Sequence, residues 1–585
     1  MSQLPPIAKS RLRFFWIGLV AVAVVFMIRL TDIQLISADK INKVSYDKRA
    51  ISRVIPAPRG RILDADGKVL AETITRYDIN VAPNVVTAVK VKLGDQLVEK
   101  SVPELATLLG TILQIDPVEI LPKLSGTSNY ANLAKRVSVQ TYRKIIALGI
   151  PWIYTDEIPF RVYPNGAIAG NLIGFVGSDG TPLAGLERTM NDCLGGVNGE
   201  ETFERGAVDG IKIPSSTVTT KAAKPGHDVV LTIQNDLQYY AQQVMAQYVK
   251  SERADWGSAV IIEVKTGKIL AAAEAPSVDP NDPGKSAAAD RMARIFQAVF
   301  EPGSTLKTVT AATAVDVGMA NPATRVVAPQ KLKVLGHLWI QDSHDHPTQH
   351  LTLTGVLRDS SNTGIVQVGI KVPKTVRYEY LKKFGLGQKT DVNFEGESSG
   401  ILHKPADWDG LTNYTSQFGQ GLAVTPIQTA MLYETIANGG VRTQPQLVAG
   451  CRQADGSLKA PYRSASTRVL KTETARTVID MLEKVVEDGP IGRTARVPGY
   501  RIAGKSGTAQ IKDGKGYGYR YAISFIGMAP ADNPRYVLAT TIYKPRTVSN
   551  SIGVTPPFKA IMEQILRTFR IPPSTTKSAN IPTEW

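Results

Sequence analysis

The sequence predicts an α+β protein with one N-terminal apolar helix and a large exported part. Apolar, strand-like runs open the C-terminal half at 229–233, 258–264 and 268–273, and others close it at 501–511, 522–529 and 536–543. Ala-rich helical stretches lie between them, at 290–320 and 420–438. Strands at both ends with helices between them predict one antiparallel sheet, shared by the two ends of the domain and flanked by helices.

Composition narrows the class of protein. The chain has 585 residues, of which 43% are hydrophobic and 21% charged, and this excludes collagen-like, disordered and coiled-coil descriptions of the whole. Only one segment resembles a membrane span, which excludes a multi-span protein. The net charge of +16 suits a protein near an anionic membrane or an anionic polymer. No finger, homeodomain or RRM motif is found, so no nucleic-acid partner is expected.

The N-terminus predicts a membrane anchor. Residues 14–28 carry no charge, and apolar character continues past Arg29 to residue 35. Three basic residues precede this segment: Lys9, Arg11 and Arg13. The positive-inside rule then places residues 1–13 in the cytoplasm and everything after the 14–35 span outside. A cleaved signal peptide is the alternative, but residues 36–38 make a poor cleavage site, so a retained anchor is favoured.

Local signals organise the exported part. Asp66-Gly67 and Lys265-Thr266-Gly267 each lie between apolar runs and predict hairpin turns. Asn235 is placed to cap an amphipathic helix. A composition shift at 215–228 predicts a linker, and residues 571–585 predict a disordered tail.

The cysteines and a histidine-rich loop are weaker candidates for functional sites. Cys193 and Cys451 lie far apart, and the sequence predicts two unpaired thiols in different domains. His344-Asp345-His346 and His350 resemble a metal cluster by spacing, yet the loop lacks the expected carboxylate and Cys partners. No metal and no organic cofactor are therefore expected.

The first of three short motifs supplies a nucleophile. Pro302-Gly303 breaks the chain before a helical run, which puts Ser304 at a helix N-terminus, where N–H groups favour developing negative charge. Lys307 lies three residues on, on the same helix face. A serine hydroxyl needs a base to become nucleophilic, and a neutral lysine can serve. Alone, this S-x-x-K pattern also fits a capped helix with a solvated lysine.

The second and third motifs supply polar groups. Ser360-Ser361-Asn362 offers a hydroxyl for proton relay and a carboxamide clamp, although a polar turn is the favoured interpretation of this motif alone. The third motif lies in the strand at 501–511 and comprises Lys505, Ser506, Gly507 and Thr508. Its glycine permits close approach of a ligand, its lysine attracts an anion, and its Thr508 N–H can join that of Ser304 in an oxyanion hole.

In this order, the three motifs resemble the S-x-x-K, S-D-N and K-T-G set of penicillin-interacting serine enzymes. Additional matches are the N-terminal anchor, R-G-R-I-L-D at 59–64, R-V-Y-P at 161–164, G-L-E at 185–187 and Y-T-S-Q-F-G-Q-G at 414–421. The chain is similar to class B penicillin-binding proteins, most of all to division-type peptidoglycan D,D-transpeptidases, over about residues 11–570. The resemblance implies a mixed pedestal, or dimerisation-type, domain at 50–222 and a transpeptidase domain at 228–570.

The resemblance also implies roles for individual residues. Ser304 would attack the penultimate D-Ala carbonyl of a stem peptide and Lys307 would accept its proton. Ser360, aided by Lys505, would pass a proton to the departing D-Ala. The amide of Asn362 would hold the donor peptide. Ser506, Gly507 and Thr508 would bind the substrate together with Lys505, and β-lactams would be trapped as acyl-enzymes.

Partners and location follow from the same resemblance. It implies stem peptides, a lipid-linked precursor, a SEDS-type glycan polymerase and other division proteins as partners, since no glycosyltransferase motif is found. The protein is expected in the cytoplasmic (inner) membrane as a single-pass protein with an extracytoplasmic catalytic domain. The alternatives are an elongation-type transpeptidase, a β-lactamase or β-lactam sensor, and a non-catalytic division scaffold.

The sequence does not assign a definite role to two other groups of residues. The Y-G-Y-R-Y stretch at 517–521 fits a pocket rim or a packed hairpin equally well. For Arg59 and Arg61, structural salt bridges are a more favoured interpretation than a functional role.

Overall fold

The computed structural model describes residues 6–204, 216–336, 338–461, 463, 465–513 and 516–585. The chain forms two compact units that are not consecutive blocks of sequence. The first unit comprises Met1–Pro58, Ile74–Phe160 and Gly196–Pro225, and the second comprises Arg59–Thr73, Arg161–Gly195 and Gly226–Trp585. Two short segments from the N-terminal half thus fold with the C-terminal half.

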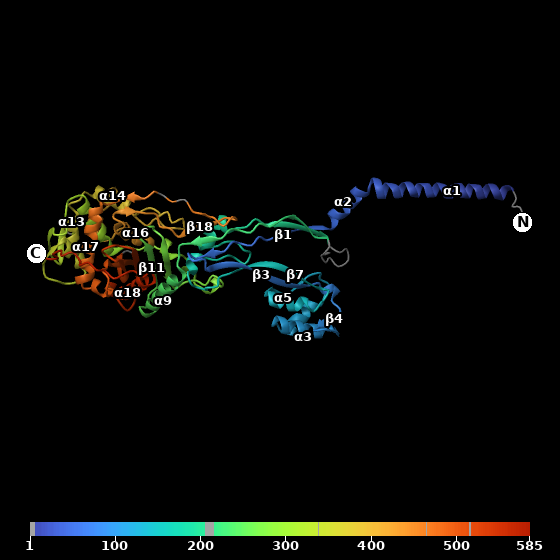
Figure 1. Ribbon diagram of the computed structural model, residues 1–585, viewed down its shortest axis with the longest axis horizontal. Coiled ribbons are helices and arrows are strands. Elements are labelled where there is room, and N and C mark those ends of the chain that lie inside the picture. Colours follow the sequence, from blue (N-terminus) through green and yellow to red (C-terminus); the bar gives the residue numbers. More distant parts are fainter. Residues whose placement is uncertain (1–5, 205–215, 337, 462, 464, 514–515) are drawn as a thin grey trace. The chain divides into compact units, whose positions relative to one another are not determined.

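The N-terminal helix has the length and exposure of a membrane span. Helix α1 (Pro6–Thr31) continues into a π-helical turn, η1 (Asp32–Ile36) (Figure 1). Within the described residues, Ser10–Ile36 is the one continuous helix long and apolar enough to cross a membrane, and none of its most apolar window is buried. This agrees with the predicted anchor at 14–35.

The first unit has a three-stranded antiparallel sheet in the order β1-β8-β9. These strands are β1 (Ala50–Ile55), β8 (Gly199–Glu204) and β9 (Val218–Lys221). The predicted linker at 215–228 is therefore wrong in part, because β9 pairs Val218 with Thr202 and Lys221 with Glu200. Thr and Val favour strands, and the partner that orders them is distant in sequence.

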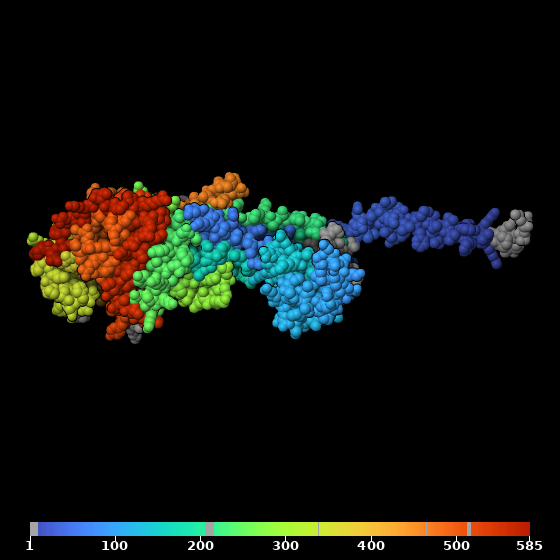
Figure 2. Space-filling model, turned by 60° about the horizontal axis from the view of Figure 1, so that its bottom comes forward, coloured from blue at the N-terminus to red at the C-terminus, as the bar shows by residue number. Residues whose placement is uncertain are grey.

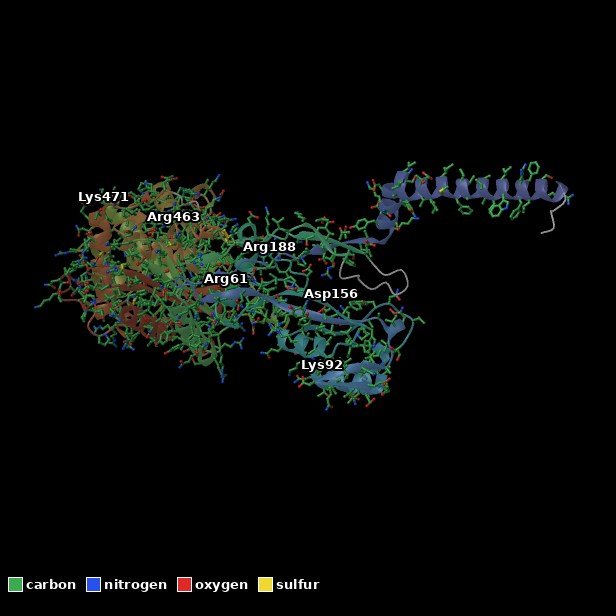
Figure 3. All side chains as sticks on the ribbon, turned by 45° about the vertical axis from the view of Figure 1, so that its right-hand side comes forward. Arg61, Lys92, Asp156, Arg188, Arg463 and Lys471 are labelled. Atoms are coloured by element: carbon green, nitrogen blue, oxygen red, sulfur yellow. A yellow bond between two sulfur atoms is a disulfide. The ribbon has the colours of Figure 1, made fainter. Side chains whose placement is uncertain are left out.

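A small α/β core completes the first unit. It packs the 74–81 part of β3 (Val69–Val81) and β6 (Ala131–Val137) with α3 (Val102–Leu113) and α5 (Val139–Ile146). Asp156, labelled in Figure 3, accepts a hydrogen bond from Arg53 of β1 at 2.5 Å. The ion pair joins β1 to β7 (Ile153–Val162).

The second unit is built on a five-stranded antiparallel sheet in the order β12-β11-β23-β22-β21. The strands are β11 (Trp256–Glu263), β12 (Ile269–Ala275), β21 (Ala503–Asp513), β22 (Gly516–Ala529) and β23 (Tyr536–Tyr543). β11 pairs with β23 along its whole length, from Trp256 opposite Tyr543 to Glu263 opposite Tyr536. The prediction that the two ends of the domain share one sheet is confirmed.

Helices cover both faces of this sheet. Ala259 and Ile261 pack with α9 (Asn235–Ser251) and α18 (Thr555–Thr568), whereas Val260 and Ile262 join the core formed with α16 (Pro426–Ala437). Figure 1 shows α16 on one side of β11 and α9 and α18 on the other. Alternate side chains of a strand point to opposite faces, so a sheet covered on both faces has strands that are apolar throughout.

Both predicted hairpin turns are confirmed. The Asp64 N–H donates to the Lys68 carbonyl across the turn between β2 (Ile62–Leu63) and β3, where Gly67 has φ 85°. The Glu263 N–H likewise donates to the Lys268 carbonyl between β11 and β12. Each turn contains a glycine in the left-handed region, which such turns favour.

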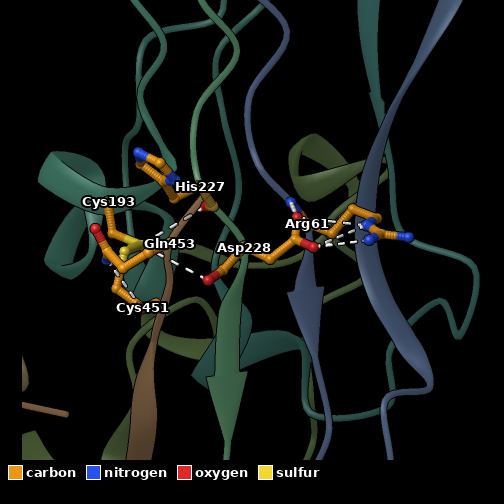
Figure 4. The surroundings of a disulfide bond; sticks show 6 residues. All are labelled: Arg61, Cys193, His227, Asp228, Cys451 and Gln453. Atoms are coloured by element: carbon orange, nitrogen blue, oxygen red, sulfur yellow. Dashed lines mark hydrogen bonds and ion pairs between the residues drawn. A yellow bond between two sulfur atoms is a disulfide. The ribbon is translucent and has the colours of Figure 1, made fainter. Parts of the chain in front are cut away.

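The two cysteines form a disulfide, so the prediction of two unpaired thiols is wrong. Cys193 and Cys451 both belong to the second unit and are joined with a Cα–Cα distance of 6.1 Å (Figure 4). Cys451 lies in β18 (Val448–Arg452) opposite Val229 of β10 (Val229–Leu231). The His227 N–H donates to the Cys193 carbonyl at 2.8 Å. Strand pairing therefore brings together thiols that are 258 residues apart.

The predicted disordered tail at 571–585 is also wrong. Its residues form hydrogen bonds along the second unit, from the Ile571 carbonyl, which accepts from the Tyr500 hydroxyl, to Trp585. Local composition favours disorder here, but backbone groups of the folded domain supply partners that composition cannot reveal.

Candidate active site

The first motif is held in a tight turn before a buried helix. Gly303 to Leu306 form a 3₁₀ turn, η7, that continues into α11 (Lys307–Asp316), so Ser304 lies at a helix start as predicted. Gly303 has φ 56°, and a Cβ there would lie 2.9 Å from the carbonyl oxygen of Thr508. Its N–H donates to the Gly419 carbonyl at 3.1 Å. A side chain at 303 would therefore separate Ser304 from the third motif.

The lysine of this motif is completely buried. Lys307 Nζ donates to the Ser360 carbonyl and, at 3.2 Å, to the Ser360 hydroxyl. Burial, followed by the positive charge of Lys505, lowers the pKa of Lys307 well below its ordinary value, against a smaller opposing effect of Asp342. The neutral amine needed for a base is favoured.

Ser360 lies at a strained corner between α12 (Leu353–Arg358) and α13 (Asn362–Gly369). Its φ of 62° is in the left-handed region, which a non-glycine residue seldom adopts. The Ser361 side chain caps α13 by accepting from the Gly364 N–H at 2.9 Å. The predicted polar turn and the predicted functional hydroxyl therefore coincide at this corner.

The sequence did not identify Asp342, which holds the second motif in place. This buried carboxylate accepts hydrogen bonds from the backbone N–H groups of Asn362 and Thr363 and from the Ser361 hydroxyl at 2.7 Å. His346 Nε2 lies 3.0 Å from it. No local pattern distinguishes Asp342 from other loop carboxylates, because its partners lie 19 to 21 residues further along the chain.

The third motif lies on the edge strand β21 and approaches both others. Lys505 is fully buried, and its Nζ donates to the Ser360 hydroxyl at 3.0 Å and to the Ser506 carbonyl at 3.2 Å. Burial lowers the pKa of Lys505 to about 7, against the opposing effect of Asp359. Two buried lysines from separate motifs thus meet at one hydroxyl.

Close packing explains the glycine of the third motif. A Cβ at Gly507 would lie 2.7 Å from the Thr305 methyl and 2.8 Å from the Pro302 carbonyl oxygen. The Thr508 hydroxyl lies 2.9 Å from that of Ser551, a buried residue that the sequence did not identify. The Ser551 hydroxyl also lies 2.7 Å from the Gly507 carbonyl.

The predicted residues do not all converge in this structure. Lys307, Ser360 and Lys505 share hydrogen bonds, and Gly303 and Gly507 bring the first and third motifs into contact. Across the described residues, the Ser304 hydroxyl has no hydrogen-bond partner, since Lys307 is directed to Ser360. The Asn362 side chain donates to the Gln341 carbonyl at 2.8 Å.

The Tyr517–Tyr521 stretch contributes one contact near the nucleophile. The Tyr517 hydroxyl donates to Glu301 Oε1 at 3.0 Å, and this carboxylate also accepts from the Gly421 N–H. Burial and the Glu301 charge raise the pKa of Tyr517. Tyr519 is almost fully exposed on the same strand. The rim interpretation therefore fits Tyr517, because its partner Glu301 lies three residues before Ser304.

Other candidates have structural partners. Arg59 pairs with Glu187 at 3.0 Å. Arg61 pairs with Asp228 at 2.7 Å (Figure 4), and the two ion pairs confirm the predicted salt bridges. The His350 ring packs edge-on against Trp585. In the described part of the chain, no group of three or more His, Cys, Asp or Glu side chains is placed to hold a metal ion.

Comparison with known proteins shows which domains the chain contains. Residues 257–563 match the penicillin binding protein transpeptidase domain, and residues 54–231 match the penicillin-binding protein dimerisation domain. The chain is 33% identical over 586 residues to the penicillin-binding protein PbpB of Mycolicibacterium smegmatis, covering 95% of this chain and 90% of that protein. It is 30% identical over 562 residues to the peptidoglycan D,D-transpeptidase FtsI of Escherichia coli K12, covering 95% and 91%.

Solved structures show the same fold. A peptidoglycan synthetase of Bifidobacterium adolescentis has a TM-score of 0.73 at 30% identity, covering 92% of this chain and all of that one. Penicillin binding protein 3 of Mycobacterium tuberculosis, solved in complex with ampicillin, has a TM-score of 0.70 at 29% identity, covering 91% and 100%. The three motifs, the two matched domains and these relatives show that the chain belongs to the penicillin-binding proteins that carry a dimerisation domain and a transpeptidase domain.

Proposed function

We propose that this protein is a peptidoglycan D,D-transpeptidase that cross-links stem peptides through an acyl-enzyme on Ser304 during septal wall synthesis. The observation that carries the proposal is the meeting of Lys307 and Lys505 at the Ser360 hydroxyl, beside the turn that presents Ser304. Two buried amines with lowered pKa values around a hydroxyl form a proton-transfer site rather than a stabilising ion pair.

Acylation begins with Ser304. Its Oγ attacks the carbonyl carbon of the penultimate D-Ala while neutral Lys307 takes its proton, and the C–N bond to the terminal D-Ala then breaks. Ser360, hydrogen-bonded to both lysines, passes a proton to the departing amine and recovers one from a lysine. The amino group of a neighbouring stem peptide then attacks the ester, forms the cross-link and frees Ser304.

The remaining predicted residues hold the substrate. Lys505, Ser506 and Thr508 receive the terminal carboxylate along the edge strand, and Gly507 lets the peptide lie close to the backbone. The N–H groups of Ser304 and Thr508 stabilise the oxyanion. Asn362 holds the donor amide from the start of α13. A bound carboxylate favours the charged form of Lys505, since an opposite charge nearby raises a lysine pKa.

The division role and its partners are supported by the relatives. Proteins named FtsI and PbpB match this chain along more than nine-tenths of its length. We infer that the substrates are stem peptides derived from a lipid-linked precursor, and that a SEDS-type polymerase and other division proteins supply and place the glycan strands.

The membrane location is supported by two features. The Ser10–Ile36 helix is long and apolar enough to anchor the protein, and basic residues precede its apolar part. The Cys193–Cys451 disulfide favours an oxidising compartment for the second unit. We infer a single-pass protein of the cytoplasmic membrane with an extracytoplasmic catalytic domain.

The test is to map the residue that a penicillin modifies. β-Lactams imitate D-Ala-D-Ala, so full-length protein in detergent should gain one benzylpenicillin on the peptide containing Ser304, and Ser304→Ala should gain none. Ser251→Ala, at the exposed end of α9, is the matched control and should label like wild type. Labelling that persists in Ser304→Ala would disprove the nucleophile. Rapid release of the bound penicillin would indicate a β-lactamase instead.

A further inference from the structure

The end of the sequence packs against the helix that precedes Ser360. The Thr352 hydroxyl donates to the Pro582 carbonyl at 2.7 Å, and the Thr352 N–H donates to the Thr583 carbonyl at 3.0 Å. A Cβ at Gly355 would lie 1.9 Å from the Thr583 carbonyl oxygen. Figure 2 shows C-terminal residues, in red, on the surface of the second unit. The close approach at Gly355 shows that α12 is shaped to accept residues Pro582–Trp585, here called the C-terminal clamp.

The C-terminal clamp binds one arginine two residues before Ser360. Arg358 donates to the Thr583 hydroxyl and to Glu584 Oε1, each at 2.6 Å. The same guanidinium donates to both oxygens of Asp359, each at 2.7 Å. One planar group therefore connects the clamp with the residue adjacent to Ser360, and a bidentate arginine–carboxylate contact fixes orientation as well as distance.

A tryptophan fixes the clamp in place. The Trp585 N–H donates to the His350 carbonyl and its indole N–H donates to the Leu351 carbonyl, at 3.1 and 3.0 Å. The Arg325 guanidinium lies 4.8 Å from the centre of the indole ring. Hydrogen bonds and a cation–π contact hold the clamp on both sides of Glu584.

Ser360 needs such external support. Its left-handed backbone conformation persists only where surrounding contacts hold it. After Asp359, the Ser361 N–H donates back to the Val356 carbonyl at 3.0 Å, which closes the turn on the same helix that the clamp contacts. Shifting this turn would move the Ser360 hydroxyl from its position between Lys307 and Lys505.

We propose that the C-terminal clamp is a positioning segment for catalysis, which holds Arg358 and Asp359 so that the Ser360 hydroxyl stays between Lys307 and Lys505. This inference rests on the proposed function. Within the described residues, the hydrogen bonds of the clamp are made with Arg358 and with residues 350–352, and none is made with Ser304, Lys307 or Lys505. The clamp therefore acts through the turn at Ser360. It should therefore govern the rate of the chemical step rather than the affinity for the antibiotic.

The test compares two parts of the same tail in full-length protein. Thr583→Val combined with Glu584→Met removes both oxygens that accept hydrogen bonds from Arg358, without shortening the chain. Thr576→Val is the matched control, since its hydroxyl contacts Arg501 and Asp532 on another part of the domain. Stopped-flow acylation with a fluorescent penicillin over a range of concentrations separates the non-covalent Kd from the acylation rate constant.

The double variant should acylate roughly tenfold more slowly, within the ~10²-fold that a misplaced catalytic group can cost, with Kd unchanged. Thr576→Val should retain the wild-type rate. Hydrogen exchange should increase at residues 359–361 in the double variant alone. An unchanged rate with unchanged exchange would overturn the proposal, and so would an equal loss of rate in Thr576→Val. If wild type itself is not acylated, the proposed function fails, and the exchange measurement still decides whether the clamp orders this turn.

Discussion

The second unit contains two clusters in which two basic side chains contact one acceptor group. The acceptor is a carboxylate in one cluster and a hydroxyl in the other. In the arginine cluster, Arg59 and Arg161 contact opposite oxygens of the buried Glu187 at 3.0 and 2.7 Å. In the lysine cluster, Lys307 and Lys505 contact the hydroxyl of Ser360. Among the described residues, no carboxylate forms a hydrogen bond with either of these lysines.

The two clusters differ in the charge of the group that lies between the two basic side chains. A carboxylate compensates the buried arginines, and guanidinium groups stay protonated in proteins. A hydroxyl compensates neither lysine, so burial drives their pKa values down and the pair gives up a proton. The arginine cluster should therefore support the fold, whereas the lysine cluster should support catalysis. Four measurements test this contrast.

The largest expected effect is on catalysis in the lysine cluster. Lys307→Ala removes the proposed base, so the acylation rate should fall by at least the ~10²–10⁴-fold that general bases contribute. Non-covalent affinity for the antibiotic should change far less, and the protein should remain folded, as measured by thermal unfolding. Acylation at a near wild-type rate would show that another group accepts the Ser304 proton.

The arginine cluster should show the opposite result. Glu187→Gln leaves the buried Arg161 and the partly buried Arg59 without their carboxylate, and breaking a buried ion pair costs about 3–5 kcal/mol of stability. Thermal unfolding should shift strongly, while the protein that remains folded acylates at the wild-type rate. Glu563→Gln, in a partly exposed pair with Lys559, is the control and should change little. Lost acylation without lost stability would assign this cluster to catalysis.

The pH dependence of acylation should report both lysines. Lys307 must be neutral and Lys505 charged, so the second-order rate constant should be bell-shaped, with its alkaline limb near the pKa of about 7 of Lys505 in the free protein. The charge of Lys505 contributes to lowering the pKa of Lys307, which means that Lys307 loses its proton first. Lys505→Arg should move the alkaline limb out of the accessible range. An unmoved limb would assign that ionisation to another group.

The smallest expected effect is at the rim of the lysine cluster. Thr508→Val removes a hydroxyl that we assign to the substrate carboxylate and keeps the backbone N–H of the oxyanion hole. One lost hydrogen bond of about 0.5–1.5 kcal/mol should weaken non-covalent binding roughly two- to tenfold, with a smaller effect on the chemical step. Ser551→Ala removes the partner of Thr508 and serves as the comparison. A defect confined to the chemical step would contradict the assigned role.

Sequence alone predicted the parts whose cause is local. The turns at Gly67 and Gly267, the Ser304 helix start and the edge strand carrying Lys505 all follow from turn chemistry, periodicity and short spacing. The shared antiparallel sheet followed from the order of strands and helices. Residue types in the three motifs also singled out Lys307, Ser360 and Lys505, which the structure brings together.

Only the tertiary structure determined the contacts between distant segments. The Cys193–Cys451 bond depends on β18 pairing with β10, and the clamp on Arg358 depends on a tail that is more than 220 residues away. Asp342 and Ser551 became visible only through the backbone groups they hold. Burial lowers the pKa values of Lys307 and Lys505, and the nearby charge of Lys505 lowers that of Lys307 further. Composition and periodicity record local preferences, whereas burial and partnership are properties of the folded chain.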